Sequence, residues 1–196
     1  WKTYEEIGKR IKIRRYRWFG KNIFHKVEKY PIIDFLYITP YLFIRTFLWM
    51  MKNHKKIDVI HAQGFNAAWI GTILKKVFKK RLVVSVQAVY QIDKDSKTAK
   101  RVTSILNQAD KVTCLSDASR RELLSFGIPD EKLAVFKHWI DINRFKKLDK
   151  LELRKKIGIE DKFTILFIGR LIEKKGVRVL AEVAKQIPEI NFVFLG

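Results

Sequence analysis

The stretch Phe163-Thr-Ile-Leu-Phe-Ile-Gly-Arg-Leu-Ile-Glu-Lys-Lys-Gly176 decides how this chain is interpreted. Its first six residues are apolar or β-branched and predict a strand, and Val177–Gln186 behind it has helical spacing. Gly169 lets the backbone approach a ligand closely, and Arg170 offers a two-pronged donor to phosphate oxygens. Lys175 adds a charge beside a helix N-terminus, whose free N–H groups attract anions. The alternative is a solvated basic turn in a lysine-rich protein.

Strands and helices alternate on the N-terminal side of this stretch as well. We predict strands at Ile57–Ala62, Leu82–Val86, Lys111–Leu115 and Leu133–Phe136, and helices at Phe65–Lys80, around Val102–Leu106 and at Arg120–Phe126. Ser119 and Glu122 have the spacing of a capping box that opens the last of these helices. Alternation with short links predicts a parallel sheet with right-handed crossovers. The fold class is therefore α/β.

The charged stretch Arg144–Lys150 interrupts this rhythm. Beyond it we predict a helix at Leu151–Ile157 and a single β-α-β unit that ends at Asn191–Leu195. We therefore assign residues 1–147 to one Rossmann-type domain and residues 148–196 to the start of a second. Because the chain begins with Trp1 and stops directly after a strand, we expect it to be part of a longer protein.

The composition is typical of a globular protein and is strongly basic. Hydrophobic residues make up 47%, and 41 Lys and Arg against 20 Asp and Glu give a formal charge of +21. Such a charge favours nucleic acid, anionic lipid head groups or phosphorylated substrates without choosing among them. Cations and aromatic residues are concentrated at Lys9–Arg17. The single cysteine, Cys114, excludes a disulfide framework and lies in an apolar run, so we expect it to be buried in a reducing, cytosolic protein.

The stretch Pro31–Met51 is long enough to cross a membrane. Asp34, Pro40 and Arg45 interrupt it, and a charge at the centre of a span costs roughly 2.5–3.5 kcal/mol. We favour a helix that begins at Pro40 and either packs on the core or lies on a membrane surface. Packing on the core would turn the following side chains inward: Tyr41, Leu42, Ile44, Phe47 and Leu48.

Several ordered motifs resemble those of GT-B fold glycosyltransferases, specifically glycosyltransferase family 4. Gly169–Gly176 is similar to the family signature G-R-L-x-x-x-K-G, and Ile57–Gly64 is similar to D-V-I-H-A-H-G. Ala109–Ser116, followed by Glu122–Gly127, resembles A-D-x-V-x-x-x-S and E-L-x-x-x-G. The resemblance covers most of the chain from Ile57 onward, and the order of the motifs is more specific than any one of them.

The resemblance implies sugar transfer from a nucleotide sugar to an acceptor, with retention of configuration and without a metal or other cofactor. The first domain would be the acceptor side, and the second would bind the nucleotide sugar. Arg170 and Lys175 match the residues that neutralise the departing diphosphate and are the catalytic candidates. The paired glutamates of the family, E-x7-E, would lie beyond Gly196. We therefore expect a chain that ends there to be inactive by itself.

The candidates for substrate binding stand at strand ends and near the hinge: Gly169, Gln87, Ser116, His61 and His138. Gln87 replaces a family histidine and can hydrogen-bond a sugar hydroxyl but cannot titrate. Gln63 replaces the second histidine of H-A-H-G, and Lys137-His-Trp-Ile-Asp141 departs from P-N-G-V-D. For His61, Ser116 and His138, local hydrogen bonding, helix capping and hinge packing are the structural alternatives.

Two other functions compete with an active transferase. The substitutions at Gln87 and Gln63 are compatible with a degenerate transferase domain that binds without catalysing. The charge and the basic–aromatic arm are compatible with a nucleic-acid-binding module, although no recognition motif supports one and we expect no specific nucleic acid partner.

We expect a cytoplasmic protein, with an acceptor that is lipid-linked or a polysaccharide and peripheral docking on the inner, anionic face of the membrane.

Overall fold

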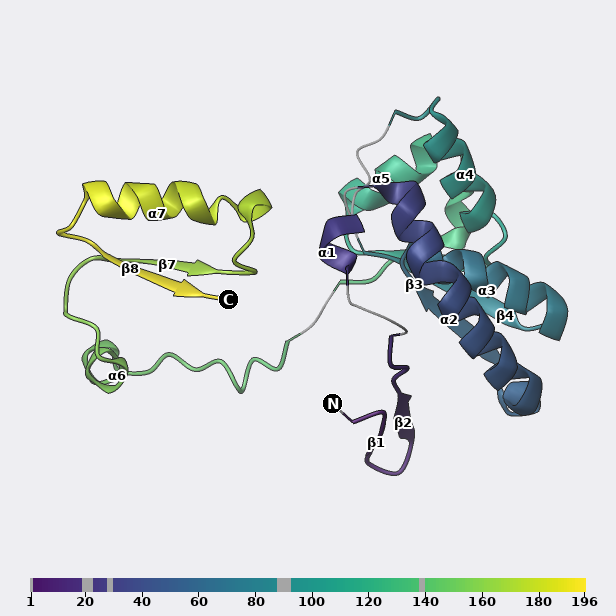
Figure 1. Cartoon of the computed structure of the whole chain (residues 1–196), viewed down its shortest axis with the longest axis horizontal. Helices are drawn as coiled ribbons and strands as arrows, with labels where there is room; N and C mark the ends of the chain where they lie inside the picture. Colours follow the sequence, from purple (N-terminus) through teal and green to yellow (C-terminus); the bar gives the residue numbers. More distant parts are fainter. Residues whose placement is uncertain (1, 19–22, 28–29, 88–92, 138–139) are drawn as a thin grey trace. The chain divides into compact units, whose positions relative to one another are not determined.

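The predicted alternation is present in the computed structural model, which describes residues 2–18, 23–27, 30–87, 93–137 and 140–196 (Figure 1). The chain divides into two compact units, Trp1–Trp139 (unit 1) and Ile140–Gly196 (unit 2). This division falls at residue 139, eight positions before the boundary drawn from the sequence at 147.

Unit 1 is built on a four-stranded parallel sheet in the order β3 (Val59–Gln63), β4 (Arg81–Val86), β5 (Lys111–Cys114) and β6 (Leu133–Val135). The strands are joined by α3 (Phe65–Phe78), α4 (Lys97–Leu106) and α5 (Asp117–Ser125), with the short η2 (Asp130–Lys132) before β6. Each crossover advances by one strand in the same direction, so the right-handed rule places all three helices on one face of the sheet. The α/β prediction is confirmed.

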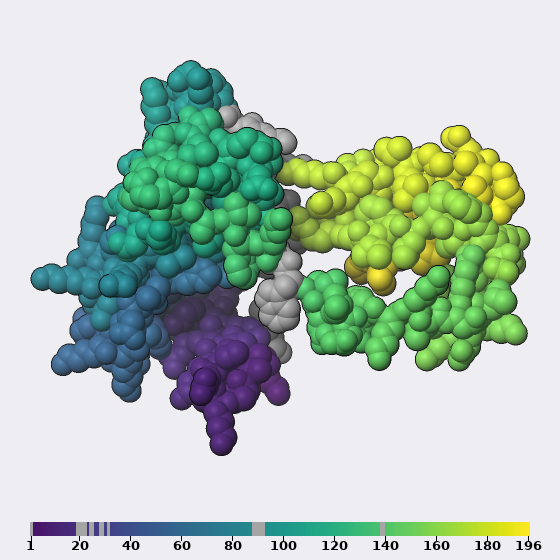
Figure 2. Space-filling view, turned by 180° about the vertical axis from the view of Figure 1, so that it is seen from behind, coloured from purple at the N-terminus to yellow at the C-terminus, as the bar shows by residue number. Residues whose placement is uncertain are grey.

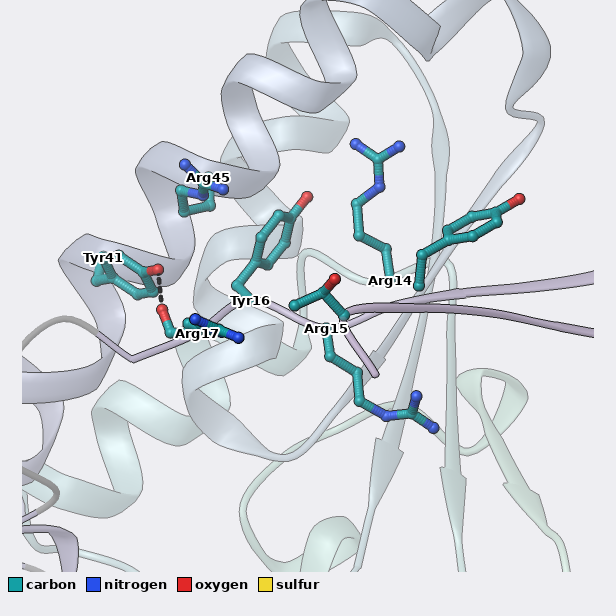
Figure 3. A pocket seen from close by; sticks show the side chains of 8 residues that line it. Arg14, Arg15, Tyr16, Arg17, Tyr41 and Arg45 are labelled. Atoms are coloured by element: carbon teal, nitrogen blue, oxygen red, sulfur yellow. Dashed lines mark hydrogen bonds between the residues drawn. The ribbon is translucent and has the colours of Figure 1, made fainter. Parts of the chain in front are cut away.

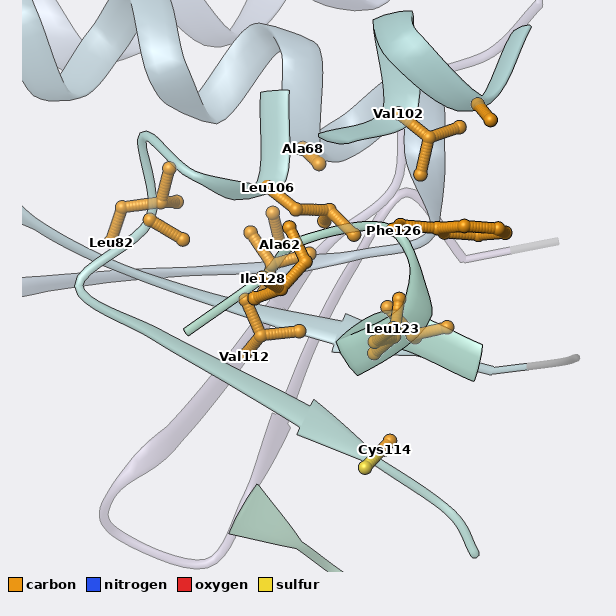
Figure 4. Close-up of a cluster of buried hydrophobic side chains, with 14 residues drawn as sticks. Ala62, Ala68, Leu82, Val102, Leu106, Val112, Cys114, Leu123, Phe126 and Ile128 are labelled. Atoms are coloured by element: carbon orange, nitrogen blue, oxygen red, sulfur yellow. The ribbon is translucent and has the colours of Figure 1, made fainter. Parts of the chain in front are cut away.

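One hydrophobic core fills the space between this face and its helices (Figure 4). Alternate residues of β4 enter it, and Leu82, Val84 and Val86 are at most 1% exposed. They meet buried leucines of α4 and α5. Cys114 is fully buried in the same core, and burial raises the pKa of its thiol. The expectation of a small buried hydrophobe at this position is confirmed.

Helix α5 begins earlier than the sequence predicted. Ser116 is its N-cap, and Oγ of Ser116 accepts a hydrogen bond from the N–H of Ser119 at 3.2 Å. The capping box that we assigned to Ser119 and Glu122 was therefore wrong. Ser119 is instead a buried residue of the first turn. The end of the helix is as predicted, because Gly127 adopts a positive φ of 83°.

A long helix, α2 (Pro31–Asn53), packs beside α3 in unit 1, after the short α1 (Phe24–Val27) and before η1 (His54–Lys56). The predicted start at Pro40 was wrong, because Pro40 lies inside the helix. Pro31 occupies the first turn, where no backbone donor is needed. Pro40 is exposed, so the carbonyl that lacks its donor stays near water. Met50 is buried against Ile70 and Leu74 of α3.

The N-terminal arm forms an antiparallel hairpin, β1 (Tyr4–Ile7) and β2 (Ile11–Arg14), that the sequence did not reveal. It projects from unit 1, as the purple segment shows in Figures 1 and 2. Trp18, just after the hairpin, connects it to α2. The Trp18 ring centroid lies 4.7 Å from that of Tyr37 and 5.0 Å from that of Tyr41.

Unit 2 holds α6 (Lys150–Ile157), β7 (Thr164–Ile168), η3 (Glu173–Lys175), α7 (Val177–Gln186) and β8 (Asn191–Leu195). The strands β7 and β8 pair in parallel, and the Phe167 and Phe194 rings lie 6.1 Å apart between their centroids. These elements confirm the predicted β-α-β unit. None of the described residues of unit 2 is buried, as expected for two strands and so few covering side chains.

Candidate active site

The turn after β7 has a backbone that only glycine favours at its two ends. Gly169 has a φ of 155° and Gly176 a φ of 72°, and the N–H of Gly169 donates to the carbonyl of Leu195 at 2.9 Å. Between them the chain tightens into η3, with the N–H of Lys175 donating to the carbonyl of Ile172 at 2.9 Å. Gly176 is the N-cap of α7 and carries no side chain to satisfy its first N–H groups. The start of α7 is therefore open to an anion.

The end of β8 lies against the same turn. A Cβ atom at Gly196 would be 2.6 Å from the carbonyl oxygen of Gly169 and 2.6 Å from Cγ of Leu171. Such distances are shorter than van der Waals contact, so only glycine fits at this point. The two strand ends of unit 2 therefore approach each other closely beside the turn.

The charges of this turn are not neutralised within it. Glu173 is its only acid and lies 3.7 Å from Nε of Arg178, in the first turn of α7. Arg170 and Lys175 are exposed and have no carboxylate partner among the residues that the structure describes. Lys174 is also exposed and has no carboxylate partner among these residues, so the turn presents three free cations ahead of an uncapped helix N-terminus. This combination is suited to a diphosphate.

Unit 1 presents its own strand-end edge. The carboxyl ends of the parallel strands β3, β4 and β5 lie on the same side of the sheet, and Gly64, with a φ of 82°, turns the chain from β3 into α3. The N–H of Gly64 donates to the carbonyl of Ser85 at 3.0 Å, which holds the ends of β3 and β4 together. Gln63 and Gln87 follow on this edge with exposed side chains. Ligands of open parallel sheets bind at such edges.

A row of polar side chains runs across the sheet face that is opposite the core. Nε2 of His61 lies 2.7 Å from Oγ of Ser85, and that hydroxyl lies 2.7 Å from Oγ1 of Thr113. The row joins β3, β4 and β5, and it fixes the orientation of the exposed His61 ring. Sequence reasoning missed Ser85 and Thr113. Each of them alternates with core residues along its strand, and this alternation predicts a side chain that points away from the core.

The remaining candidates for substrate binding have local structural partners or fall outside the described residues. Ser116 caps α5, which gives its hydroxyl a structural partner already. Asp141, the counterpart of the last residue of P-N-G-V-D, accepts a hydrogen bond from the N–H of Asn143 at 3.0 Å. His138 and Trp139 lie outside the residues that the structure describes.

The family comparison decides the assignment. The model of glycosyltransferase family 4 matches residues 7–144, which is most of unit 1 and the first residues of unit 2. The chain belongs to glycosyltransferase family 4. The family resemblance expected from the strand-end motifs is thereby confirmed.

Two curated proteins are similar to this family 4 chain in sequence. An uncharacterized glycosyltransferase of Methanocaldococcus jannaschii is 28% identical over 149 residues, which are 68% of this chain and 38% of that protein. Alpha-galactosylglucosyldiacylglycerol synthase of Streptococcus pneumoniae is 24% identical over 99 residues, 48% of this chain and 26% of that enzyme. The chain therefore spans well under half the length of these relatives.

Solved structures agree on the fold. Sucrose-phosphate synthase of Thermosynechococcus elongatus has a TM-score of 0.75 at 16% identity, over 100% of this chain and 49% of that one. HepE of Anabaena, in complex with UDP-glucose, has a TM-score of 0.60 at 18% identity, over 75% of this chain and 50% of that one. The predicted GT-B-like fold class is confirmed, and the family 4 chain spans about half of either structure.

Proposed function

We propose that the full-length protein transfers a sugar from a nucleoside diphosphate sugar to an acceptor hydroxyl, with retention at the anomeric carbon. The Gly169–Gly176 turn carries this proposal, because it combines an uncapped helix N-terminus with Arg170 and Lys175, which have no carboxylate partner in the described part of the chain. The HepE structures, which contain UDP or UDP-glucose, support a nucleotide-sugar donor.

In the proposed step the bond between the anomeric carbon and the diphosphate oxygen breaks, and its electron pair leaves with the diphosphate. Arg170 and Lys175 stabilise the charge that develops there, together with the N–H groups that open α7. Gly169 has no side chain of its own, so the phosphates can approach its backbone. The acceptor oxygen forms the new bond on the same face of the sugar, and its proton passes to the departing diphosphate oxygen.

On the acceptor side we propose roles for His61, Gln87, Ser116 and His138 in substrate binding. Geometry supports His61 best, because its ring is exposed and is held in place by Ser85. Gln87 is exposed at the end of β4 and is suited to hydrogen-bonding a hydroxyl. Ser116 has the weakest support, since its hydroxyl already caps α5.

We further propose an acceptor that is lipid-linked or a polysaccharide, used at the cytoplasmic face of the membrane. The similarity to a galactosylglucosyldiacylglycerol synthase supports the lipid-linked form. The +21 charge of the chain supports work at an anionic surface.

The stereochemistry tests the proposal. The full-length protein should be incubated with UDP-glucose and other nucleoside diphosphate sugars, and the first-formed product should be followed by proton NMR. We expect release of the nucleoside diphosphate together with a product that keeps the anomeric configuration of the donor. An inverted product, or no turnover with any donor that binds, contradicts it.

A further inference from the structure

Helix α2 exposes an apolar stripe along its whole outer side. Ile33, Leu36, Ile44, Leu48 and Met51 are each half or more exposed, and the exposed Pro40 fills the gap between them. Their spacing of three or four residues keeps them on one side of a helix about 35 Å long. The expectation that Ile44 and Leu48 face the core was wrong, whereas Tyr41, Leu42 and Phe47 are partly buried as expected.

The helix also meets the length and composition of a membrane span. The segment Ile32–Lys56 is apolar enough to cross a bilayer. Only 6% of its most apolar stretch is buried inside the protein. Its inner side, however, packs on α3: Met50 is 4% exposed, and the Phe35 and Trp69 rings meet edge to face with centroids 5.4 Å apart. A helix with one packed side and one apolar exposed side is suited to lie in a membrane interface rather than cross it.

A basic hollow borders this stripe. Its volume is about 460 Å³, and none of the described residues that line it carries a carboxylate (Figure 3). The lining residues are Thr3, Tyr4, Arg14, Arg15, Tyr16, Arg17, Tyr41 and Arg45. A second hollow of about 650 Å³ shares three of these residues and continues along α2 to Leu48, Met51 and Lys52. Basic and apolar surfaces are therefore continuous.

Of the four arginines that line the hollow, one is neutralised by a carboxylate and another is positioned by an aromatic ring. The guanidinium carbon of Arg45 stands 4.9 Å from the centre of the Tyr16 ring, and the Tyr41 hydroxyl donates to the carbonyl of Arg17. Arg15 is paired with Glu5 at 2.7 Å and points away from Arg14, Tyr16 and Arg45 in Figure 3. Among the described residues, Arg14, Arg17 and Arg45 have no carboxylate partner.

We propose that the outer side of α2 and the arginine hollow together form a docking surface for a bilayer that contains anionic lipid. The apolar stripe would enter the region between head groups and acyl chains, while the arginines bind lipid phosphates. Charge complementarity selects this occupant. Asp34 is the only acid of α2, and it points inward, with its carboxylate oxygen 3.5 Å from the Asn66 amide nitrogen.

The position of α2 connects this surface with the proposed acceptor side, so this inference rests on the proposed function. Asn66 and Trp69 belong to the first turns of α3, which starts at the carboxyl end of β3. Their partners Asp34 and Phe35 open α2. The N-terminal end of the docking helix therefore lies beside the strand ends of unit 1, and docking would bring that edge to the membrane, where a lipid-linked acceptor resides.

Vesicle flotation of the full-length protein tests the proposal without requiring turnover. Vesicles of phosphatidylcholine alone are compared with vesicles that contain about 30% phosphatidylglycerol, at about 0.1 M and about 0.5 M NaCl. We expect strong binding only to the anionic vesicles at low salt, and extraction by alkaline carbonate. Equal binding to both vesicle types, or protein that resists carbonate extraction as a true span does, overturns the proposal.

Paired variants locate the surface. Replacing Arg14 and Arg45 by serine should weaken binding to anionic vesicles by about fivefold for each arginine. The matched control replaces Lys100 and Arg101 of α4, which are exposed and carry the same charge, and should leave binding within about twofold. Equal losses in the two variants would mean that the overall charge binds, and would contradict a defined surface.

The apolar half needs its own variant. Replacing Ile44 and Leu48 by serine should reduce vesicle binding by about tenfold or more, with an unchanged melting temperature because both side chains are exposed. Sedimentation without vesicles should show a monomer at all concentrations, both for the unchanged protein and for the variant with serine at positions 44 and 48. A self-association that this variant abolishes, with no loss of vesicle binding, would assign the stripe to a second copy and overturn the proposal.

Discussion

Nε2 of His61 lies 2.7 Å from the hydroxyl oxygen of Ser85, on the sheet face that no core residue of β3 or β4 occupies. The same hydroxyl lies 2.7 Å from Oγ1 of Thr113, so a single buried serine joins three strands. His61 is exposed despite this anchoring. A side chain that is both oriented and accessible is what a substrate-binding role requires.

Ser85→Ala should therefore affect substrate use more than folding. We expect kcat/KM for the acceptor to fall about tenfold in the full-length enzyme, because the His61 ring loses its orienting partner, with a stability loss of about 1 kcal/mol. Ser85→Thr keeps the hydroxyl and should recover most of the activity. Acceptor kinetics measured well below the melting temperature decide the matter. Kinetics for Ser85→Ala that equal those of the unchanged enzyme would leave His61 with a structural role only.

Asp110 should control stability at acid pH. One oxygen of its carboxylate accepts from Nζ of Lys75 at 2.7 Å, and the other accepts from the N–H of Leu82 at 2.6 Å. Burial acts to raise the pKa of the Asp110 carboxyl, but these hydrogen bonds outweigh it and lower the pKa below its usual 3.8. A lowered pKa means that the charged form stabilises the fold above pH 3.8, and that this contribution is lost as the pH falls through the folded-state pKa.

Asp110→Asn should accordingly cost about 1 kcal/mol in free energy of unfolding at pH 7, a low value because the side chain remains 44% exposed. Urea titrations at pH 7 and pH 3 should show the difference from the unchanged protein shrinking at the lower pH. Asp58→Asn, at an exposed aspartate, is the control and should change stability little at either pH. A gap of the same size at pH 7 and pH 3 would exclude the charge as its cause.

Gly71 should tolerate no side chain. A Cβ atom there would stand 2.7 Å from Cδ1 of Leu82, which is fully buried, so one of the two must shift. We expect Gly71→Ala to destabilise the protein by about 1–3 kcal/mol, because the Leu82 side chain or α3 must shift within a packed core. Leu82→Val combined with Gly71→Ala should recover part of that loss. Additive effects of the two substitutions in thermal unfolding would show that they do not meet.

The sequence predicted the elements whose pattern is set locally. Runs of apolar and β-branched residues predicted β4 and β7. The helices predicted to end at Phe126 and Ile157 are each followed by a glycine with a positive φ in the structure. The start of α5 was misjudged because several serines compete to cap it, and only packing places Ser116 outside and Ser119 inside the core. Pro40 was misjudged for a similar reason, since tertiary contacts with α3 hold a helix that propensity alone would end.

For the candidate site, the sequence likewise predicted the features that depend on local pattern. Strand ends and glycines predicted where ligands would meet the backbone, so Gly169, His61 and Gln87 were named. Ser85 was not, because its alternation with core residues predicts only that it points away from the core, and the neighbouring strand is needed to place His61 beside it. The hairpin of residues 4–14 was missed because its strands are short and mostly exposed, without the alternation that burial imposes.

Turnover by Arg170 variants of the full-length enzyme tests the central claim most directly, with a nucleotide sugar as donor and Lys174→Ala as the control for a neighbouring exposed cation. We predict that Arg170→Ala lowers kcat by about 100- to 1000-fold, because the arginine stabilises charge that develops on the leaving diphosphate. Arg170→Lys should recover part of this loss, and Lys174→Ala should stay within about twofold of the unchanged enzyme. Near-normal kcat for Arg170→Ala would contradict the assignment of the Gly169–Gly176 turn as the diphosphate site.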